Sequence, residues 1–406
     1  MSMIPYNHNY KIDRFGLYNS GSLCYLNALI QSLVSLPSFV KSLYAYEDEF
    51  SEADNSLGLR LLRLCKAFDS GPDFMNRTDN GTFTQAILAD VSGILSEIQS
   101  IRKKSGKVDN LHLNTQEDVF EGFKFLIESL DETNTIDGEV FLNIFAIRHR
   151  LMIHCECGKK HTADRSSAPA EIMMNMSDQS PLLQKDLNSQ EMIEQYIKMN
   201  MLYPDDYRCE TCNRKNNLSK NIHPIRQIYT LARISSVIVF CVSHNHKVLL
   251  ENAFAKRGQP KKERTVAWFP QELTFLDNKR NLLHYKVIAQ IEQFGNLTSG
   301  HYIAKCLRPR PPGHARNRLN TAKKNLKDLY QRIRVAKEIG NTSRIKTLEN
   351  TAFKMVSIIK EEEKCLSSNN PWDKMGVFQF DDGKITYIPE GFKPSKFTYL
   401  VFYHLV

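Results

Sequence analysis

Long hydrophobic runs are missing from this sequence of 406 residues. No stretch of ~18 consecutive apolar residues occurs, which excludes a transmembrane helix. The opening MSMIPYNHNYKIDRFG lacks a basic segment followed by an apolar core, so we expect no secretory signal and no membrane partner. Cysteine is sparse, with nine residues and no dense framework. This usage is typical of the cytoplasm or nucleus, where thiols are catalytic, metal-bound or simply buried.

Internal repeats are also absent, and the excess positive charge is confined to one segment. The net charge is +9, and residues 307–364 hold fifteen Lys and Arg against six Asp and Glu, which accounts for the whole excess. Hydrophobic residues make up 42% and charged residues 24%, as in soluble globular proteins. Because single cores rarely exceed ~250–300 residues, we expect two or more subdomains.

The hydrophobic pattern changes along the chain from helical to strand-like. Apolar residues have helical spacing in 56–68, 89–101 and 114–130, and in the last segment Thr115 and Asp118 have the spacing of a capping box. From residue 141 onward, alternation and β-branched or aromatic residues predict strands within 140–155, 228–244, 282–294 and 397–406. The sequence therefore predicts an α+β fold, with a helical first part packed on a mainly antiparallel second part.

The basic segment has a helical pattern of its own. Leu319, Leu326 and Ile333 recur every seven residues, and a similar apolar spacing resumes after Gly340 and continues to Ile359. Two such stripes around a glycine turn predict an antiparallel helical hairpin. We place it at 307–370, as an insertion that follows the stiff linker RPRPPGH. Its charge suits a protein partner, a nucleic acid or simply a solvated surface, and strong salt dependence of binding would distinguish nucleic-acid contact.

Four cysteines form two close pairs, Cys155 with Cys157 and Cys209 with Cys212. Two thiolate pairs ~50 residues apart can surround one structural Zn²⁺ tetrahedrally and leave no open position for catalysis. The second pair has the usual C-x-x-C spacing, whereas C-x-C is tighter than usual. Because His154 and Cys157 would restore the three-residue step, the identity of the fourth ligand stays open. A ribbon that binds no metal is the alternative to a zinc site.

Cys24 lies where a turn-rich loop enters a helix. GLYNSGS precedes it, and the apolar residues that follow have the spacing of one buried helix face up to Pro37. Free amides and the positive end of the helix dipole favour a thiolate at such a position. A small buried cysteine at a packed helix start is the plainer interpretation.

Two further motifs carry side chains that could serve a thiolate. NLTSGHYIAKC presents His301, and VFQFDDGKITYI presents Asp381 and Asp382 before a turn glycine. Taken singly, they are a structural histidine and an Asp-Gly hairpin turn. Taken together with Cys24, they supply the nucleophile, the base and the orienting group of a cysteine protease.

These motifs resemble those of the ubiquitin-specific proteases, a family of cysteine deubiquitinases. GLYNSGSLCYLNALIQSL resembles the family's cysteine box, QEDVFEGFKFLI its glutamine box and HYKVIAQIEQFGNLTSGHYIAKC its histidine box. FDDGKI and FTYLVFYHL resemble the motifs with which the family domain closes, and the two cysteine pairs lie where the family has a zinc ribbon. The matches keep the family's order over residues 12–406.

The resemblance implies a role for each matching residue. Cys24 would be the nucleophile, His301 its base, Asp381 the residue that orients the imidazole, and Asp382 a second polar group near that ring. Asn19 would donate its amide to the oxyanion beside the Cys24 N–H. The ubiquitin tail would meet Gln116, Asp118, Glu121, Gly300 and Tyr302. The departures from the family pattern, at Ser22, Leu23, Glu117 and Gln293, spare these catalytic positions.

The resemblance also implies a papain-like fold with a helical thumb at 12–140, zinc-ribbon fingers at 141–230 and a palm at 231–406 that carries the hairpin. The implied reaction is hydrolysis of the bond after the C-terminal glycine of ubiquitin, through an acyl-enzyme on Cys24. It needs a structural zinc and no catalytic cofactor, and its partners are ubiquitin and ubiquitinated proteins. Two alternatives stay open: the same chemistry on another ubiquitin-like modifier, and a ubiquitin-binding pseudoenzyme.

Overall fold

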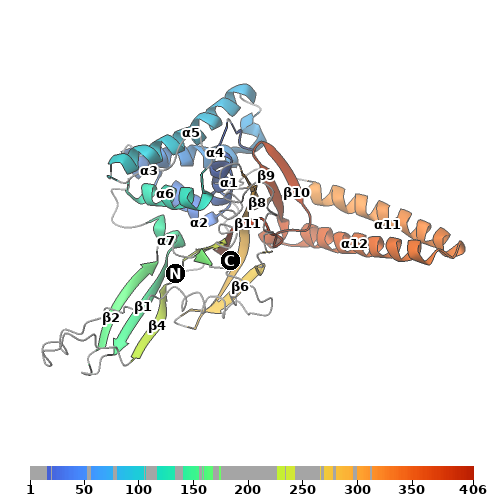
Figure 1. Ribbon diagram of the computed structural model, residues 1–406. Coiled ribbons are helices and arrows are strands. Elements are labelled where there is room, and N and C mark those ends of the chain that lie inside the picture. Colours follow the sequence, from blue (N-terminus) through green and yellow to red (C-terminus); the bar gives the residue numbers. More distant parts are fainter. Residues whose placement is uncertain are drawn as a thin grey trace, which may run out of the picture.

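The computed structural model describes residues 16–19, 21–52, 56–75, 80–104, 106, 117–132, 140–154, 158, 160–167, 173–174, 226–233, 235–242, 266, 269–277, 280–295, 300–310 and 313–406. Helices dominate its first part and strands its second part (Figure 1). Among the helices in these ranges, none is long and apolar enough to cross a membrane.

The first part consists of helices α1 (Cys24–Leu33), α2 (Pro37–Ala45), α3 (Glu47–Glu52), α4 (Ser56–Met75), α5 (Asn80–Lys104), α6 (Val119–Glu132) and α7 (Leu142–Phe145). Pro37 is the first residue of α2, where its missing N–H would have had no helical partner. The predicted capping box is wrong, because α6 begins at Val119 and Asp118 itself accepts the N–H groups of Phe120 and Glu121.

The strand predicted within 140–155 covers only the second half of that segment, and the first half is a helix. Residues Leu142–Phe145 form α7, and the strand β1 covers only Ile147–His154. The Asp131 carboxylate at the end of α6 accepts the N–H groups of Phe141 and Leu142 at 2.9 and 2.6 Å. This cap from the preceding helix satisfies backbone N–H groups that a short helix cannot satisfy by itself. The sequence of α7 and its neighbours does not predict it.

The second part contains two sheets. An eight-stranded sheet has the order β10-β9-β8-β7-β11-β5-β3, and β6 also pairs with β7. Its strands are β3 (Met173–Met174), β5 (Val237–Val242), β6 (Glu272–Leu276), β7 (Leu282–Phe294), β8 (His301–Pro309), β9 (Met375–Asp381), β10 (Lys384–Ile388) and β11 (Thr398–Leu405). All pairs are antiparallel except the short pair of β3 with β5.

A separate three-stranded sheet has the order β2-β1-β4, formed by β1, β2 (Lys160–Ser167) and β4 (Arg226–Arg233). It extends away from the helices and the larger sheet (Figure 1). The apolar run 228–244 is thus split near Ser235 between β4 and β5, which belong to different sheets.

One continuous core joins the helices to the larger sheet. Every residue of α1 is buried, because the helix lies between α6 and the strands β7, β8 and β9. The Phe123 ring of α6 makes edge contacts with Phe145 and with Phe402 of β11, at centroid distances of 5.0 and 5.9 Å. Burial of this kind fixes α1, and therefore Cys24, against the strands that carry the other candidate residues.

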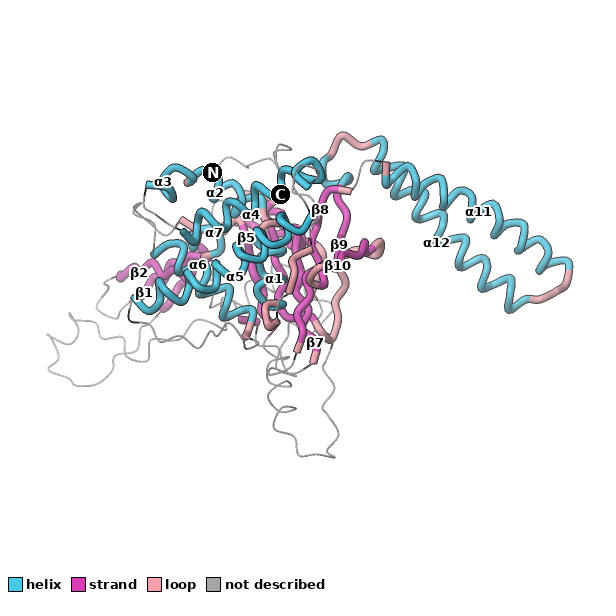
Figure 2. The backbone as a smooth tube through the Cα atoms, turned by 90° about the horizontal axis from the view of Figure 1, so that it is seen from above, coloured by secondary structure: helices cyan, strands magenta, loops and turns pink. Residues whose placement is uncertain are grey.

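Two antiparallel helices occupy the segment in which the heptads predict a hairpin. Helix α11 covers His314–Glu338 and α12 covers Thr342–Ser367, with Gly340 at a φ of 72° between them. In the chain, the hairpin lies between β8 and β9, and the short 3-10 helix Pro371–Lys374 leads from α12 into β9. The hairpin projects far from the rest of the molecule (Figures 1 and 2).

Candidate active site

Cys24 is the first residue of α1, and the loop before it is fixed by Asn19. The Asn19 side-chain oxygen accepts the backbone N–H groups of Gly21 and Leu23 at 3.0 and 3.1 Å. These two bonds tie the turn together and satisfy donors at the start of α1. The Cys24 side chain is reduced and 4% exposed.

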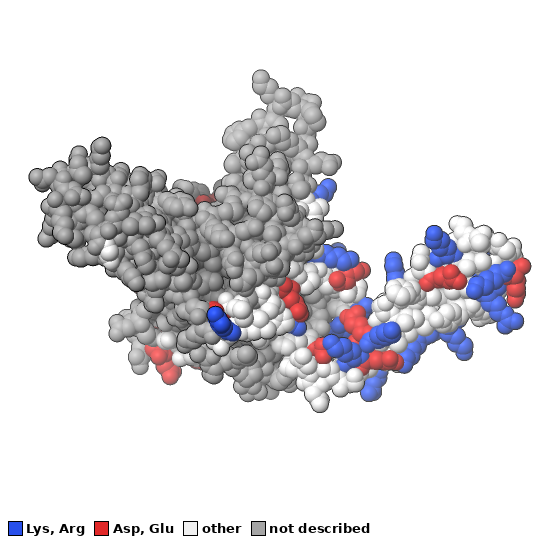
Figure 3. Space-filling model, turned by 90° about the horizontal axis from the view of Figure 1, so that it is seen from below, with Lys and Arg blue, Asp and Glu red and all other residues white. Residues whose placement is uncertain are grey.

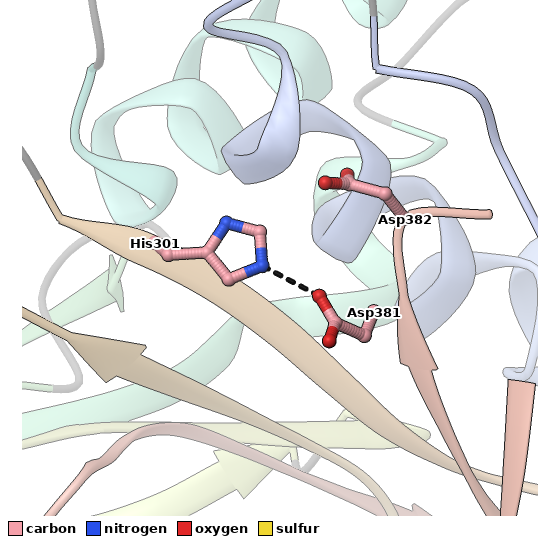
Figure 4. A group of neighbouring side chains, drawn as sticks. All are labelled: His301, Asp381 and Asp382. Atoms are coloured by element: carbon pink, nitrogen blue, oxygen red, sulfur yellow. Dashed lines mark hydrogen bonds and ion pairs between the residues drawn. The ribbon is translucent and has the colours of Figure 1, made fainter. Parts of the chain in front are cut away.

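His301, the first residue of β8, faces Asp381, the last residue of β9 (Figure 4). Its Nε2 lies 2.6 Å from the Asp381 Oδ1. The neighbouring Cys24 raises the pKa of His301 most, and the bond to Asp381 raises it further. Partial burial lowers it, and the resulting pKa is about 9. Because Nε2 is bonded to Asp381, the ring's Nδ1 is left for the thiol. The three candidate triad residues therefore come together.

Asp382 belongs to the same turn but faces the cysteine loop. Because Asp381 pairs with Lys384, Asp382 and Gly383 form a two-residue hairpin turn, and Asp382 has a φ of 49°. Its Oδ1 accepts the Asn27 amide at 2.9 Å, and its Oδ2 accepts the Asn19 amide at 3.1 Å. The hairpin-turn interpretation of the Asp-Gly pair is confirmed, and the turn places polar groups beside the loop that precedes Cys24.

Backbone contacts hold the same two segments together. The Leu17 N–H donates to the Asp382 carbonyl oxygen at 3.1 Å. A Cβ atom added at Gly16 would lie 2.5 Å from the Gly383 carbonyl oxygen. Glycine at position 16 therefore allows the loop before Cys24 to approach the turn that carries the two aspartates.

Asn27 is a residue whose part in the site the sequence did not reveal. It is 2% exposed in α1, and its amide also lies 3.4 Å from the carbonyl oxygens of Leu17 and Tyr18. A buried amide three residues after the candidate nucleophile was the available signal, because buried polar groups need partners. Its partner, Asp382, is 355 residues away in sequence.

The predicted contacts to a ubiquitin tail fall in different environments. Glu121 is exposed on α6 and Gly300 is half-buried before His301, whereas Gln116 lies outside the described residues. The Asp118 carboxylate caps α6 with one oxygen and accepts the Tyr399 hydroxyl with the other. Tyr302 is 2% exposed. Asp118 therefore ties α6 to β11, whereas the contacts of these residues with a ubiquitin tail stay predictions.

The possible metal ligands are of two kinds. His301, Asp381 and Asp382 each offer one atom within 4.8 Å of the others. Both Asp382 oxygens already accept amide hydrogens, and Asp381 already bonds the imidazole, so the group is satisfied as a hydrogen-bonded network. Cys155, Cys157, Cys209 and Cys212 lie outside the described residues, and so does the side chain of His154.

A loop cysteine at a helix start, an imidazole and an aspartate on neighbouring strands form the constellation of a thiol hydrolase. The sequence model of the family described as "Ubiquitin carboxyl-terminal hydrolase" matches residues 15–328, well over half of the chain. The chain therefore belongs to this family, within its ubiquitin-specific proteases. The matched span ends within α11, before Asp381 and Asp382.

Curated relatives agree with this assignment. "Ubiquitin carboxyl-terminal hydrolase 9X" of Mus musculus is 22% identical over 237 residues, which are 51% of this chain and 9% of that protein. "Ubiquitin carboxyl-terminal hydrolase 9Y" of Mus musculus is 25% identical over 239 residues, with the same coverage. The match thus spans only about a tenth of the length of these much longer relatives.

Solved structures share the fold. The "SAGA DUB module Ubp8(C146A)/Sgf11/Sus1/Sgf73 bound to monoubiquitin" matches with a TM-score of 0.53 and 16% identity, over 100% of this chain and 72% of that chain. The same module "bound to ubiquitin aldehyde" matches with a TM-score of 0.52 and 14% identity, with the same coverage. The predicted mixed fold of helices and antiparallel sheet is confirmed, whereas the bounds of thumb, fingers and palm and the zinc ribbon stay predictions.

Proposed function

We propose that this chain is a deubiquitinase that hydrolyses the bond after the C-terminal glycine of ubiquitin. The observation that carries the proposal is the bond of His301 Nε2 to Asp381 at 2.6 Å, with Cys24 close enough to the imidazole to raise its pKa. Membership of the ubiquitin carboxyl-terminal hydrolase family supports the substrate class. Structural neighbours bound to ubiquitin and to ubiquitin aldehyde agree with it.

In the proposed reaction, His301 takes the proton from the Cys24 sulfur, and the thiolate attacks the carbonyl carbon of the terminal glycine. Asp381 holds the imidazole and stabilises its positive charge. The imidazolium then gives its proton to the leaving amine as the carbon–nitrogen bond breaks, which leaves a thioester on Cys24. A water molecule deprotonated by His301 attacks the thioester, and the thiol leaves with a proton.

Charge on the carbonyl oxygen would be stabilised by two donors, the Cys24 backbone N–H and the Asn19 side-chain amide. One Asn19 amide hydrogen is donated to Asp382, and the second remains for the oxyanion. Because the amide is already oriented by its bonds on both sides, little reorganisation is needed during the reaction. Loss of one such donor typically costs ~3–4 kcal/mol in the transition state.

We also propose a structural zinc ion held by Cys155, Cys157, Cys209 and Cys212, with His154 as the alternative to one cysteine. Support comes from the smaller sheet, in which His154, the last residue of β1, pairs with Arg226, the first residue of β4. One cysteine pair directly follows that end of β1, and the other precedes β4 in the chain. Such an ion would fasten the ribbon by thiolate coordination and would take no part in the hydrolysis.

Turnover of ubiquitin that carries a fluorogenic amide at its C-terminus tests the function. We expect release of the fluorophore by the wild-type chain and loss of at least ~10³-fold in kcat for Cys24→Ala and for His301→Ala. Turnover of another ubiquitin-like modifier instead of ubiquitin would overturn the substrate. Binding of ubiquitin without turnover of any modifier would overturn the activity and leave a pseudoenzyme.

A further inference from the structure

The helical hairpin is attached to the sheet only near its base, as far as the described residues go. Arg310 bonds Glu361 and Glu362 at 2.7 and 2.6 Å, and Arg318 bonds the Tyr387 hydroxyl of β10 at 2.7 Å. Glu362 is fully buried between the two arginines. The base therefore has a network of buried ion pairs, which fixes the direction in which the hairpin projects.

Beyond the base, α11 and α12 pack only on each other among the described residues. Their small core consists of Leu329, Ile333, Ala336, Leu348 and Ala352, with Leu326, Ile345 and Met355 at its margin. A two-helix hairpin with so narrow a core leaves two broad faces uncovered, one on each side of the seam.

The two faces differ in character. The ion pairs Lys323–Glu363 and Lys337–Glu349 cross the seam and mark one of them. Residues at helical spacings of three and four from these pairs share the same face. We call this the aromatic face; it comprises Lys323, Lys327, Tyr330, Arg334 and Lys337 of α11 and Lys346, Glu349, Phe353, Val356, Lys360 and Glu363 of α12.

The aromatic face combines large exposed apolar side chains with positive charge. Phe353 is 74% exposed and Tyr330 is 56% exposed, and the face carries six Lys and Arg against two Glu. Figure 3 shows Lys and Arg side chains gathered along the projecting hairpin. Neighbouring exposed aromatics on a monomer are unusual, since their hydration has a free-energy cost that burial would remove.

The opposite face has the same helices but a different surface. By the same spacing it presents Thr321, Asn325, Asp328, Arg332 and Val335 of α11 and Arg344, Thr347, Thr351, Lys354 and Ile358 of α12, which are polar except for the exposed Val335 and the half-buried Ile358. The threonine hydroxyls at 347 and 351 bond carbonyls of their own helix, and Arg332 pairs with Asp328. What distinguishes the two faces is that the exposed aromatic rings, Tyr330 and Phe353, both lie on the aromatic face.

We infer that the aromatic face is a docking surface for an acidic amphipathic helix of a partner protein. An apolar stripe on that helix would cover Phe353, Tyr330 and Val356, and carboxylates on its flanks would meet Lys327, Arg334 and the lysines of α12. Helix α11, with 25 residues, is about 37 Å long, so a partner helix of about 20 residues fits alongside it. The three helices would then form a small bundle.

Charge alone would also suit a nucleic acid, but the arrangement on this face favours a protein. Phosphates gain nothing from the exposed Phe353 ring at the centre of the face, and Glu349 and Glu363 within it would repel them. The inference concerns binding alone and stands independently of the proposed hydrolysis.

Selection from a displayed library of helical peptides, each about 20 residues long, tests the inference on the full chain. We expect the enriched peptides to be acidic and to have apolar residues at helical spacing. In a titration with one such peptide, Phe353→Asp and Lys327→Glu should each weaken binding by about tenfold or more. Arg332→Glu changes the charge by the same amount on the opposite face and should leave binding within about twofold of the wild type.

Two outcomes would overturn the inference. One is enrichment of peptides without acidic amphipathic character, or equal binding by the wild-type chain and Phe353→Asp. The other is tighter binding of duplex DNA or single-stranded RNA than of any selected peptide, with the steep salt dependence of phosphate contacts. Thermal unfolding of each variant, expected to match the wild type because these side chains are exposed, keeps the comparison independent of misfolding.

Discussion

Asp382 accepts the side-chain amide of Asn19 across 3.1 Å, although 363 residues separate the two in the chain. The turn that presents Asp381 to the imidazole thereby also orients the amide proposed for the oxyanion. One hairpin turn thus positions both sides of the candidate reaction centre. Asp382 is therefore a positioning residue in this account, distinct from the triad residue Asp381.

A double-mutant cycle tests this coupling. Asn19→Ala should lower kcat about 10²–10³-fold through loss of an oxyanion donor. Asp382→Ala should lower kcat in the same direction by less, and the double variant should be about as slow as Asn19→Ala alone, because Asp382 acts through Asn19. Glu390→Ala, which removes an exposed carboxylate, is the control. If the fold-losses in kcat of the two single variants multiply in the double variant, Asp382 acts independently of Asn19.

The pH profile should reflect the raised pKa of His301. With a pKa of about 9, the imidazole loses its proton near pH 9, so kcat/KM should fall on that alkaline side. Asp381→Asn removes one of the interactions that raise this pKa, so the alkaline limb should move to lower pH. An alkaline limb at the same pH in both proteins would contradict the assignment of Asp381.

Acid should destabilise the fold through His404 of β11. Its Nε2 accepts the Ser38 N–H at the start of α2, its Nδ1 donates to the Leu405 carbonyl oxygen, and burial lowers its pKa to about 4. The unfolded chain has a histidine pKa near 6.5 and therefore binds more protons between pH 6.5 and 4. This histidine's contribution is complete above pH 6.5 and decreases by up to about 1.4 kcal/mol for each unit below it.

Urea unfolding at pH 7 and pH 5 measures that effect. The free energy of unfolding of the wild type should fall more between these pH values than that of His404→Gln, which cannot gain a proton. The variant is expected to be less stable at pH 7, so the comparison concerns the slope with pH. Equal slopes for the two proteins would contradict a buried neutral His404.

Zinc analysis tests the proposed ribbon. The purified chain should contain one Zn²⁺, and Cys209→Ser and Cys212→Ser should each lose it, because a structural site needs all of its ligands. Cys365→Ser, at a buried free cysteine of α12, is the control. Comparison of His154→Ala with Cys155→Ser identifies the remaining ligand as the residue whose loss releases zinc. Full zinc content in the Cys209→Ser variant would contradict the assignment.

Local patterns in the sequence were sufficient for the parts of the fold that depend on neighbours in the chain. The turn-rich loop, the buried face of α1 and the heptads of the hairpin are such patterns, and each corresponds to an observed element. The ordered motifs likewise located Cys24, His301 and Asp381, which the structure brings together.

Errors arose where distant residues decide the local structure. Asp131 caps α7 from the preceding helix and so interrupts an apolar run that otherwise has the composition of a strand. Asp118 bonds Tyr399, 281 residues away, so it also has a structural part that the resemblance did not imply, while its contact with a ubiquitin tail stays a prediction. The bond between Asn27 and Asp382 joins two ends of the chain in the same way, and neither residue's own neighbours reveal it.

The most direct test of the central claim uses ubiquitin that carries an electrophile at its C-terminus, followed by mass spectrometry of the protein and of its peptides. The account predicts the addition of one ubiquitin, on the peptide that contains Cys24, no reaction in Cys24→Ala, and full reaction in the Cys365→Ala control. Modification of another cysteine, equal labelling of Cys24→Ala, or no adduct with ubiquitin would contradict Cys24 as the nucleophile of a deubiquitinase.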